Sequence, residues 1–325
     1  MCKMYLCPVC KAEFSLPTCI KCGFTVKSIN NIMQISDSPD IVTDGDGDKY
    51  IGYEHIGEHF SGKRKHDIDE RGRLCAEEIA KLTGDGIFLD IACGDGYFTV
   101  PCAALGTKII AGDISNAMLG ILQDKAGLNG ISLENVTLCR INALDIPLAT
   151  ESIDAAAANS VLHLISNPQK VISEIYRVLK KGGAFICIDD APGNYDSQNS
   201  IDNSRYNEIV NGIYSKYWEE LGKAGICPKK YSWHFDRNAY CQSIFESCEV
   251  KTVKRGNVFS IPMKDGFLPR ITNRGFSDQV DVPADIHNRV LQNLLRDFKV
   301  IYGEDFEEIA YKGIEEDLII TIFRK

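Results

Sequence analysis

The stretch "LDIACGDGYFT", residues 89–99, constrains the fold more than any other part of this chain. An apolar run ends in the acid Asp90, a loop of small residues follows, and a helix-like segment comes next. A strand, a tight glycine loop and a helix in this order hold a nucleotide in many folds. The stretch therefore predicts the start of a nucleotide-binding α/β domain.

The sequence after residue 67 alternates between helix-like and strand-like segments. Strands are predicted at 87–91, 108–112, 136–141, 153–158 and 184–189, and helices at about 67–82, 96–104, 116–126 and 168–179. Gly182-Gly183, which follows "RVLKK", is a C-cap signal for the last of these helices. Short strands separated by helices favour a doubly wound parallel sheet with helices on both faces.

The residues around the glycine loop discriminate between nucleotides. A dinucleotide loop reads GxGxxG, and counting from Gly94 the third small position is held by Thr99, which fits poorly. Asp90 and Asp95 flank the loop, so they disfavour a pyrophosphate and favour a cationic ligand such as S-adenosylmethionine. Asp113 ends the second strand, where an acid can accept both ribose hydroxyls of an adenosine. A helix N-cap is the structural alternative for Asp113.

Four motifs in this region are similar to successive motifs of one enzyme family. They are "LDIACGDGYFT", "AGDISNAML", "INALDIPLATESIDAAAANSVLHL" and "EIYRVLKKGGAFICID". Together they resemble the class I S-adenosylmethionine-dependent methyltransferases of the ubiquinone/menaquinone type, also described as methyltransferase type 11. The resemblance covers about residues 85–190 and the final strands. It departs at Ala92, where the family usually has its first glycine.

The resemblance implies a set of cofactor-binding residues. The methionine end of S-adenosylmethionine would lie against Asp90, Ala92, Gly94 and Gly96. Asp113 would hold the ribose, and the adenine would be contacted by Ile114, Met118, Asn142 and Ala143. Asn142 replaces the more usual aspartate, but an amide can still pair with the exocyclic amine of adenine. Core packing is the alternative role for Ile114 and Met118.

The resemblance also implies candidates for the catalytic residues. Asn159, at the end of the fourth strand, would lie next to the transferring methyl group. His163, just after that strand, and Tyr53, in an aromatic segment before the core, are candidates for catalysis. A general base is needed only if the acceptor must lose a proton. A purely structural histidine is the alternative for His163.

The N-terminus carries a metal-binding pattern. Two CxxC pairs, Cys7 with Cys10 and Cys19 with Cys22, are separated by eight residues. This spacing can place four thiolates around one structural zinc ion at about 2.3 Å. The segment is too short to bury a core, so the metal would supply its folding energy. Because the core supplies no ligand, we expect the core to bind its cofactor without the metal.

Composition shifts suggest how the chain is organised. Seven segments are expected: a zinc ribbon, a linker that covers the cofactor, the binding core, a lid insertion, a core helix and strand, a second lid insertion and the final strand, at 1–30, 31–66, 67–190, 191–235, 236–255, 256–311 and 312–325. In the later segments a helix is predicted at 237–247, strands at 249–254 and 317–323, and an amphipathic helix at 284–302. The two insertions are expected to form a mostly helical lid, packed together over the cofactor end of the sheet.

Charge and composition narrow the range of functions that this chain can have. The net charge is −9, and no apolar run approaches the roughly 20 residues of a membrane span. The N-terminus is not a signal peptide, so a cytoplasmic protein with no membrane or DNA partner is expected. A small-molecule methyl acceptor is therefore favoured. The alternative is ribosomal RNA, because a zinc ribbon before such a core resembles the guanine-N1 methyltransferases. A non-catalytic adenosine-binding module is a third hypothesis.

Overall fold

The computed structural model describes residues 4–36, 41–43, 49–51, 68–165, 167–190, 202–228, 235–255, 258–279, 282–314 and 317–325. The chain forms two compact units. The core unit comprises Met1–Asp189, Tyr231–Val253 and Ile319–Lys325. The helical unit comprises Asp190–Lys230 and Lys254–Leu318, so the chain leaves the core twice and returns twice.

The core unit is built on a nine-stranded sheet, in the order β12-β15-β11-β10-β7-β8-β9-β4-β3. In chain order these strands are β3 (Lys27–Ile29), β4 (Ile32–Gln34), β7 (Ile87–Ile91), β8 (Lys108–Asp113), β9 (Val136–Arg140), β10 (Ile153–Ala157), β11 (Leu179–Asp190), β12 (Ser247–Val253) and β15 (Leu318–Arg324). The pairs β10–β7, β7–β8, β8–β9 and β10–β11 are parallel. Their apolar residues are buried on both faces, as parallel strands require.

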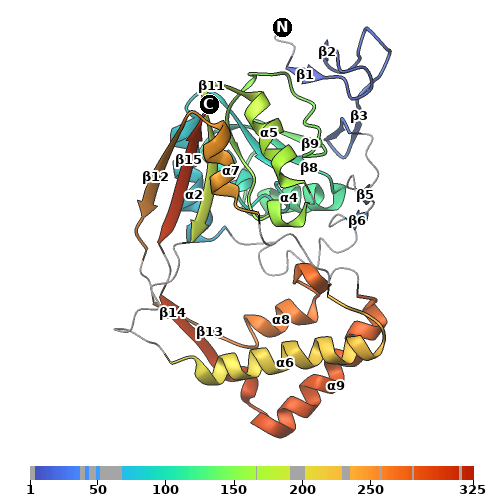
Figure 1. Cartoon of the computed structure of the whole chain (residues 1–325), viewed down its shortest axis with the longest axis vertical. Helices are drawn as coiled ribbons and strands as arrows, with labels where there is room; N and C mark the ends of the chain where they lie inside the picture. Colours follow the sequence, from blue (N-terminus) through green and yellow to red (C-terminus); the bar gives the residue numbers. More distant parts are fainter. Residues whose placement is uncertain are drawn as a thin grey trace. The chain divides into compact units, whose positions relative to one another are not determined.

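Helices cover both faces of this sheet. Their bounds are α2 (Glu70–Thr83), α3 (Thr99–Ala104), α4 (Asn116–Leu128), η2 (Leu162–Leu164), α5 (Pro168–Val178) and α7 (Arg237–Ile244). Helix α2 contacts α3, and α3 contacts α4, so these three form one layer. Figure 1 shows α5 and α7 in front of the strands and α2 behind them. The expected doubly wound, Rossmann-like α/β fold is confirmed.

Two local expectations in the core were wrong. Helix α3 begins at Thr99 rather than near residue 96, because Gly96 has φ 79° and the chain still turns there. Gly182-Gly183 does not cap α5, which ends at Val178 and passes directly into β11. Gly182 instead has φ 75° within β11, in an irregular stretch where the pairing with β10 shifts register.

The N-terminal segment is attached to the core sheet. Strands β1 (Tyr5–Leu6) and β2 (Glu13–Phe14) form a small antiparallel pair. The hairpin β3–β4 follows, and β4 runs parallel to β9, so two strands that were not predicted extend the sheet beyond β9. The expected boundary at residue 30 falls inside this hairpin. Within the predicted linker, β5 (Ile41–Thr43) and β6 (Lys49–Ile51) form another antiparallel pair.

The helical unit contains the two insertions. Its elements are α6 (Ser204–Lys223), β13 (Val258–Pro262), α8 (Phe267–Thr272), η3 (Ser277–Gln279), α9 (Ala284–Tyr302), η4 (Phe306–Glu308) and β14 (Ala310–Ile314). Helix α6 was not predicted, and neither was the antiparallel β13–β14 pair, whereas α9 was predicted at its observed bounds. Helices α6 and α9 contact each other and share apolar clusters, so the insertions pack together as expected.

The aromatic residues of α6 pack inside this unit, whereas Phe235, at the end of the first insertion, packs against the apolar cluster of the core unit. Tyr217 is fully buried on α6, and its hydroxyl is 2.7 Å from His287 Nδ1 on α9. His287 Nε2 lies 2.9 Å from the Thr272 carbonyl oxygen, so Nε2 carries the hydrogen and Nδ1 accepts from the tyrosine. Burial lowers the pKa of His287, which favours this neutral form. Tyr217 therefore ties together α6, α8 and α9.

No helix in the described part of the chain has both the length and the apolar character needed to cross a membrane.

We expect Tyr217→Phe to lower the free energy of unfolding by about 1–3 kcal/mol, because His287 Nδ1 would stay buried without its donor. Urea denaturation followed by circular dichroism would measure this. Tyr302→Phe is the matched control, since the Tyr302 hydroxyl donates to the exposed Glu208 at 3.1 Å and its loss should change stability by less than about 0.5 kcal/mol. Equal effects of the two substitutions would contradict this account.

Candidate functional site

Four neighbouring parallel strands bring the predicted cofactor residues to one edge of the sheet. Strands β10, β7, β8 and β9 lie side by side, so their carboxyl ends meet at the same edge. Asp90 in β7 pairs in register with Ala157 of β10, and Asp113 ends β8. Asn142 follows β9 and Asn159 follows β10. Ligands of open α/β sheets bind at this edge.

The glycine loop between β7 and α3 is held against β8. The Cys93 amide donates to the Gly112 carbonyl at 3.1 Å, and the Gly94 amide donates to Asp113 Oδ2 at 2.9 Å. The Gly96 amide closes the loop by donating to the Cys93 carbonyl at 2.9 Å. The loop therefore lies directly over the acid that ends β8.

The backbone of this loop explains its small residues. Ala92 and Gly96 both have positive φ, at 54° and 79°. A Cβ on Gly96 would lie 2.6 Å from Leu122 Cγ, so this glycine lets α3 and α4 pack closely. Ala92 adopts the left-handed conformation despite its Cβ, at a cost of about 1–2 kcal/mol. A glycine at this position, which the family usually has, would adopt the same conformation without that cost.

Three buried acids lie around the loop. Asp90, Asp95 and Asp113 are 2%, 7% and 9% exposed. Asp90 Oδ2 accepts a hydrogen bond of 2.6 Å from the Thr99 hydroxyl at the start of α3. Burial, with the negative charges of Asp113 and Asp95 adding to it, raises the pKa of Asp90 to about 7. A cationic group at this edge of the sheet would reduce the electrostatic repulsion between these carboxylates.

Asp95 is turned toward a buried lysine, which the sequence analysis missed. Lys125 on α4 is 1% exposed, and its Nζ lies 3.7 Å from Asp95 Oδ2. Within the described part of the chain, that oxygen is buried without a hydrogen-bond partner. Asp95 was expected to help attract a cationic ligand, but its charge is offset from within the protein. A lysine on the apolar face of a helix, beside Leu122 and Ala126, was the available signal.

Asp113, the acid predicted to hold the ribose, accepts hydrogen bonds from two backbone amides. Its Oδ1 accepts the Ser115 amide at 2.9 Å, and its Oδ2 accepts the Gly94 amide. Ser115, rather than Asp113, caps α4, because its hydroxyl oxygen accepts the Met118 amide at 3.1 Å. A carboxylate offers about four acceptor positions, so Asp113 can also take hydroxyl donors from a ligand.

The predicted adenine residues flank Asp113. Met118 is buried beneath the loop, where its Cε would lie 3.3 Å from a Cβ on Gly94. Ile114, Asn142 and Ala143 are half-buried. Asn142 Oδ1 accepts the Leu144 amide at 2.9 Å, and the Asn142 carbonyl accepts the Asp145 amide at 3.0 Å. Residues 142–145 therefore form a tight turn, which we call the adenine turn after the role predicted for Asn142 and Ala143.

The candidate catalytic residues differ in how far the structure describes them. His163 is half-buried in η2, and burial lowers its pKa, so it is neutral near pH 7 and able to accept a proton. Asn159 is half-buried just after β10. Tyr53 lies outside the described residues.

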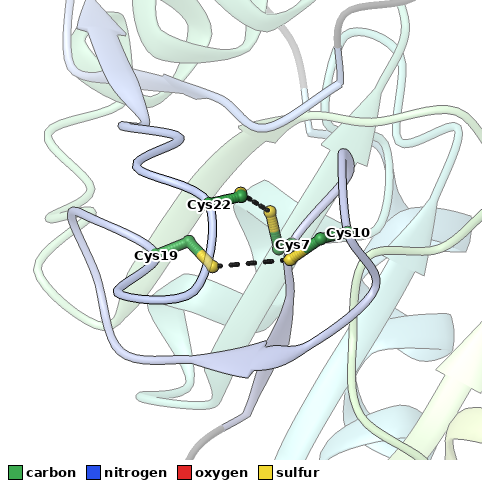
Figure 2. Close-up of side chains that lie close together, drawn as sticks. All are labelled: Cys7, Cys10, Cys19 and Cys22. Atoms are coloured by element: carbon green, nitrogen blue, oxygen red, sulfur yellow. Dashed lines mark hydrogen bonds between the residues drawn. The ribbon is translucent and has the colours of Figure 1, made fainter.

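The four N-terminal cysteines converge, as Figure 2 shows. Their sulfur atoms all lie within 4.8 Å of one another, with Cys7 and Cys22 at 3.4 Å and Cys10 and Cys19 at 3.7 Å. Four sulfurs at about 2.3 Å from one zinc ion would lie about 3.8 Å apart. The cysteines are free thiols, and Cys7 and Cys19 are buried. This donor set fits a tetrahedral zinc site.

These features define an α/β domain of the Rossmann-like class, with a glycine loop and buried acids at the carboxyl edge of a parallel sheet and a separate set of four thiols. Residues 89–187, which contain the glycine loop, Asp113 and the adenine turn, match the family model of the methyltransferase domain. This part of the chain is therefore a methyltransferase domain.

Curated relatives match about a third of this chain. The chain is 36% identical over 109 residues to the demethylmenaquinone methyltransferase of Symbiobacterium thermophilum, covering 33% of this chain and 43% of that protein. It is 34% identical over 122 residues to an uncharacterized chloroplastic methyltransferase of Arabidopsis thaliana, covering 36% of this chain and 34% of that protein. The chain thus spans less than half the length of either relative. The solved YcgJ protein of Bacillus subtilis is 16% identical, with a TM-score of 0.45 over 79% of this chain and 99% of that one.

The raised pKa of Asp90 predicts how stability depends on pH. Between about pH 4 and pH 7 the folded chain holds a proton on Asp90 that the unfolded chain has lost, so the free energy of unfolding falls as pH rises through this window. Asp90→Asn should remove this dependence and raise the free energy of unfolding at pH 8 by about 0.5–2 kcal/mol. Urea denaturation of the ligand-free protein at pH 5 and pH 8 would measure it.

Asp124→Asn, at an exposed position on α4, is the control and should leave the pH profile unchanged. If Asp90→Asn and the wild type lose stability equally between pH 5 and pH 8, the buried acid does not have the effect described.

Proposed function

We propose that this protein is an S-adenosylmethionine-dependent methyltransferase that acts on a small-molecule acceptor. The observation that carries the proposal is the pair of buried acids, Asp90 and Asp113, at neighbouring strand ends beneath a glycine loop. Negative charge at this point suits a sulfonium and an ammonium group and disfavours a pyrophosphate. The match of residues 89–187 to the methyltransferase domain supports the same ligand.

Different residues at the carboxyl edge of the sheet would bind different parts of the cofactor. Asp90 would face the cationic methionine part, with Ala92, Gly94 and Gly96 allowing close approach of the backbone. Asp113 would accept the ribose hydroxyls. The adenine turn, with Ala143 beside Asn142, would contact the adenine on one side, and Ile114 and Met118 on the other.

The cofactor supplies an activated methyl group, which the nucleophile of the acceptor takes by in-line displacement at carbon. The protein has to align the acceptor with this group and exclude water, and alignment alone can lower the barrier by roughly 7–11 kcal/mol. Asn159, which follows β10, would orient the acceptor. Neutral His163 would take up the proton of an acceptor that must lose one. Tyr53 is retained as a further candidate.

A small acceptor is favoured over RNA. The relative from Symbiobacterium thermophilum is named a demethylmenaquinone methyltransferase, which makes a quinone-like molecule the first candidate. The net charge of −9 is unfavourable for binding a polyanion. The family match and the relatives give the ribosomal RNA alternative no support. The covering of the cofactor edge by the helical unit, and a cytoplasmic location, stay predictions.

The cofactor assignment predicts the effect of Asp113→Ala. This variant should bind S-adenosylhomocysteine about 10- to 100-fold more weakly, because two ribose hydroxyls lose a charged acceptor. Calorimetric titration would measure the affinity, with Asp124→Ala as an exposed control. Tight binding of NAD without any response to S-adenosylhomocysteine would overturn the assignment. A labelled methyl donor, offered with quinones, a metabolite extract and total RNA in separate reactions, would identify the class of acceptor.

We also propose that the four cysteines hold one structural zinc ion per chain. Elemental analysis of protein purified without added metal should give one zinc, and Cys10→Ser with Cys19→Ser should lose it, because thiolates are the ligands zinc requires here. Cys248→Ser, which replaces an exposed cysteine outside the set, should keep it. A folded N-terminal segment that contains no metal would refute the zinc site.

A further inference from the structure

Strand β1, the first strand of the zinc ribbon, is hydrogen-bonded to the core unit. The Leu6 amide donates to the Pro147 carbonyl at 3.0 Å, and the Ala149 amide donates to the Met4 carbonyl at 2.7 Å. Between these bonds Tyr5 pairs with Leu148 in antiparallel register. Strand β1 is therefore also a partner of residues 147–149, which follow the adenine turn.

A lysine of the first cysteine knuckle reaches the adenine turn itself. Lys11 follows Cys10, and its backbone has φ 56° and donates to the Cys7 carbonyl at 2.9 Å. Its Nζ forms an ion pair with the carboxylate of Asp145. Asp145 is the last residue of the adenine turn, and its amide donates to the Asn142 carbonyl. The conformation of the knuckle thus sets where Lys11 can hold the turn.

The buried thiols of the metal site belong to the same apolar cluster as the residues around the adenine turn. Cys7 and Cys19 are 0% and 1% exposed. They belong to the apolar cluster that also contains Ile141 and Ile146, on either side of the adenine turn. Two of the four thiols are therefore part of the apolar cluster against which Ala143 and Leu144 of the turn pack.

The N-terminal segment also borders the other side of the adenosine site. Gln34 in β4 and Asn116 exchange two side-chain hydrogen bonds, of 2.9 and 3.3 Å. Asn116 begins α4, three residues after Asp113. The segment that carries the ribbon thus contacts both loops that would enclose the adenosine, one after β8 and one after β9.

Helix α5 holds the segment after the turn independently of the ribbon. Arg177 donates to the carbonyls of Ile146 and Leu148, both at 2.7 Å. Glu174 Oε2 accepts the Ile146 amide at 3.1 Å. Loss of the ribbon would therefore release one side of this segment and leave the other side in place. We therefore expect the cofactor site still to form without the ribbon and to bind its ligand more weakly.

We propose that the metal-bound ribbon is a working part of the cofactor site, in which Lys11 and β1 position the adenine turn, so that metal occupancy sets the affinity for the cofactor. This inference rests on the proposed function, because it takes the adenine turn to be part of an S-adenosylmethionine site. It replaces the expectation that the core binds its cofactor independently of the metal. Lys11 is a positioning residue in this scheme, since it acts through Asp145.

The first test compares metal-loaded and metal-stripped protein in a calorimetric titration with S-adenosylhomocysteine. Removal of the metal with a chelator should weaken binding about 5- to 50-fold. Linkage requires the reverse effect of the same size, so saturating S-adenosylhomocysteine should tighten zinc binding by that factor in a competition with a chromophoric chelator. Hydrogen exchange should show faster exchange at residues 142–149 in the stripped protein.

The second test keeps the metal in place and changes the lysine. Lys11→Ala should retain one zinc and bind S-adenosylhomocysteine about two- to fivefold more weakly, since the ion pair is exposed and of modest strength. Lys11→Arg should restore affinity. Asp145→Ala should have the same effect as Lys11→Ala, and the double variant should be no weaker than either. Lys21→Ala, in the second knuckle and exposed, is the control and should bind normally.

The outcomes separate this proposal from the proposed function. If metal-loaded protein fails to bind S-adenosylhomocysteine, the cofactor assignment is wrong. If it binds with the same affinity with and without metal, and Lys11→Ala matches Lys21→Ala, the cofactor assignment stands and the coupling is wrong. If the stripped protein unfolds, the metal-bound Lys11 and Asp145 variants decide the question.

Discussion

The hydrogen bond from the Gly94 amide to Asp113 is the interaction on which the candidate site depends. It joins the loop after one strand to the end of the next, so the two loops that would enclose an adenosine are fixed relative to each other. The bond holds Asp113 against the loop that follows Asp90, and burial together with the charge of Asp113 raises the pKa of Asp90 to about 7. The chain therefore keeps an unfavourable concentration of negative charge at the point where a cationic ligand would bind.

The strand, loop and helix pattern of the methyltransferase domain could be predicted from the sequence because it depends on local signals. The apolar runs that end in Asp90 and Asp113, and the small residues between Ala92 and Gly96, are all visible along the chain. Gly182-Gly183 was misjudged because the same dipeptide suits a helix cap and an irregular strand, and only the pairing with β10 distinguishes them. Helix α6 was missed, although its buried residues recur at every fourth position and include the aromatic Tyr217.

Contacts between distant parts of the chain could not be predicted in the same way. Asp95 was recognised as an acid beside the loop, but its pairing with Lys125 depends on how α4 packs under that loop. The four cysteines were recognised from their spacing, whereas the bonds from Met4 and Leu6 to residues 147–149 follow no sequence pattern. The bonds from Met4 and Leu6 join residues that are more than a hundred positions apart in the sequence. They make the ribbon, which was expected to be a separate segment, part of the core unit.

The order of strands in the sheet has a consequence for how the chain folds. Strand β15 lies between β11 and β12, although it follows both in the sequence. Residues 254–317, which belong to the helical unit, separate β12 from β15, its neighbour among the described strands of the sheet. Closing such a long loop before any pairing is gained is slow. Until β15 pairs with β11, the apolar strand β11 has an edge without a hydrogen-bonded neighbour. A partly folded chain at this stage is therefore prone to aggregate.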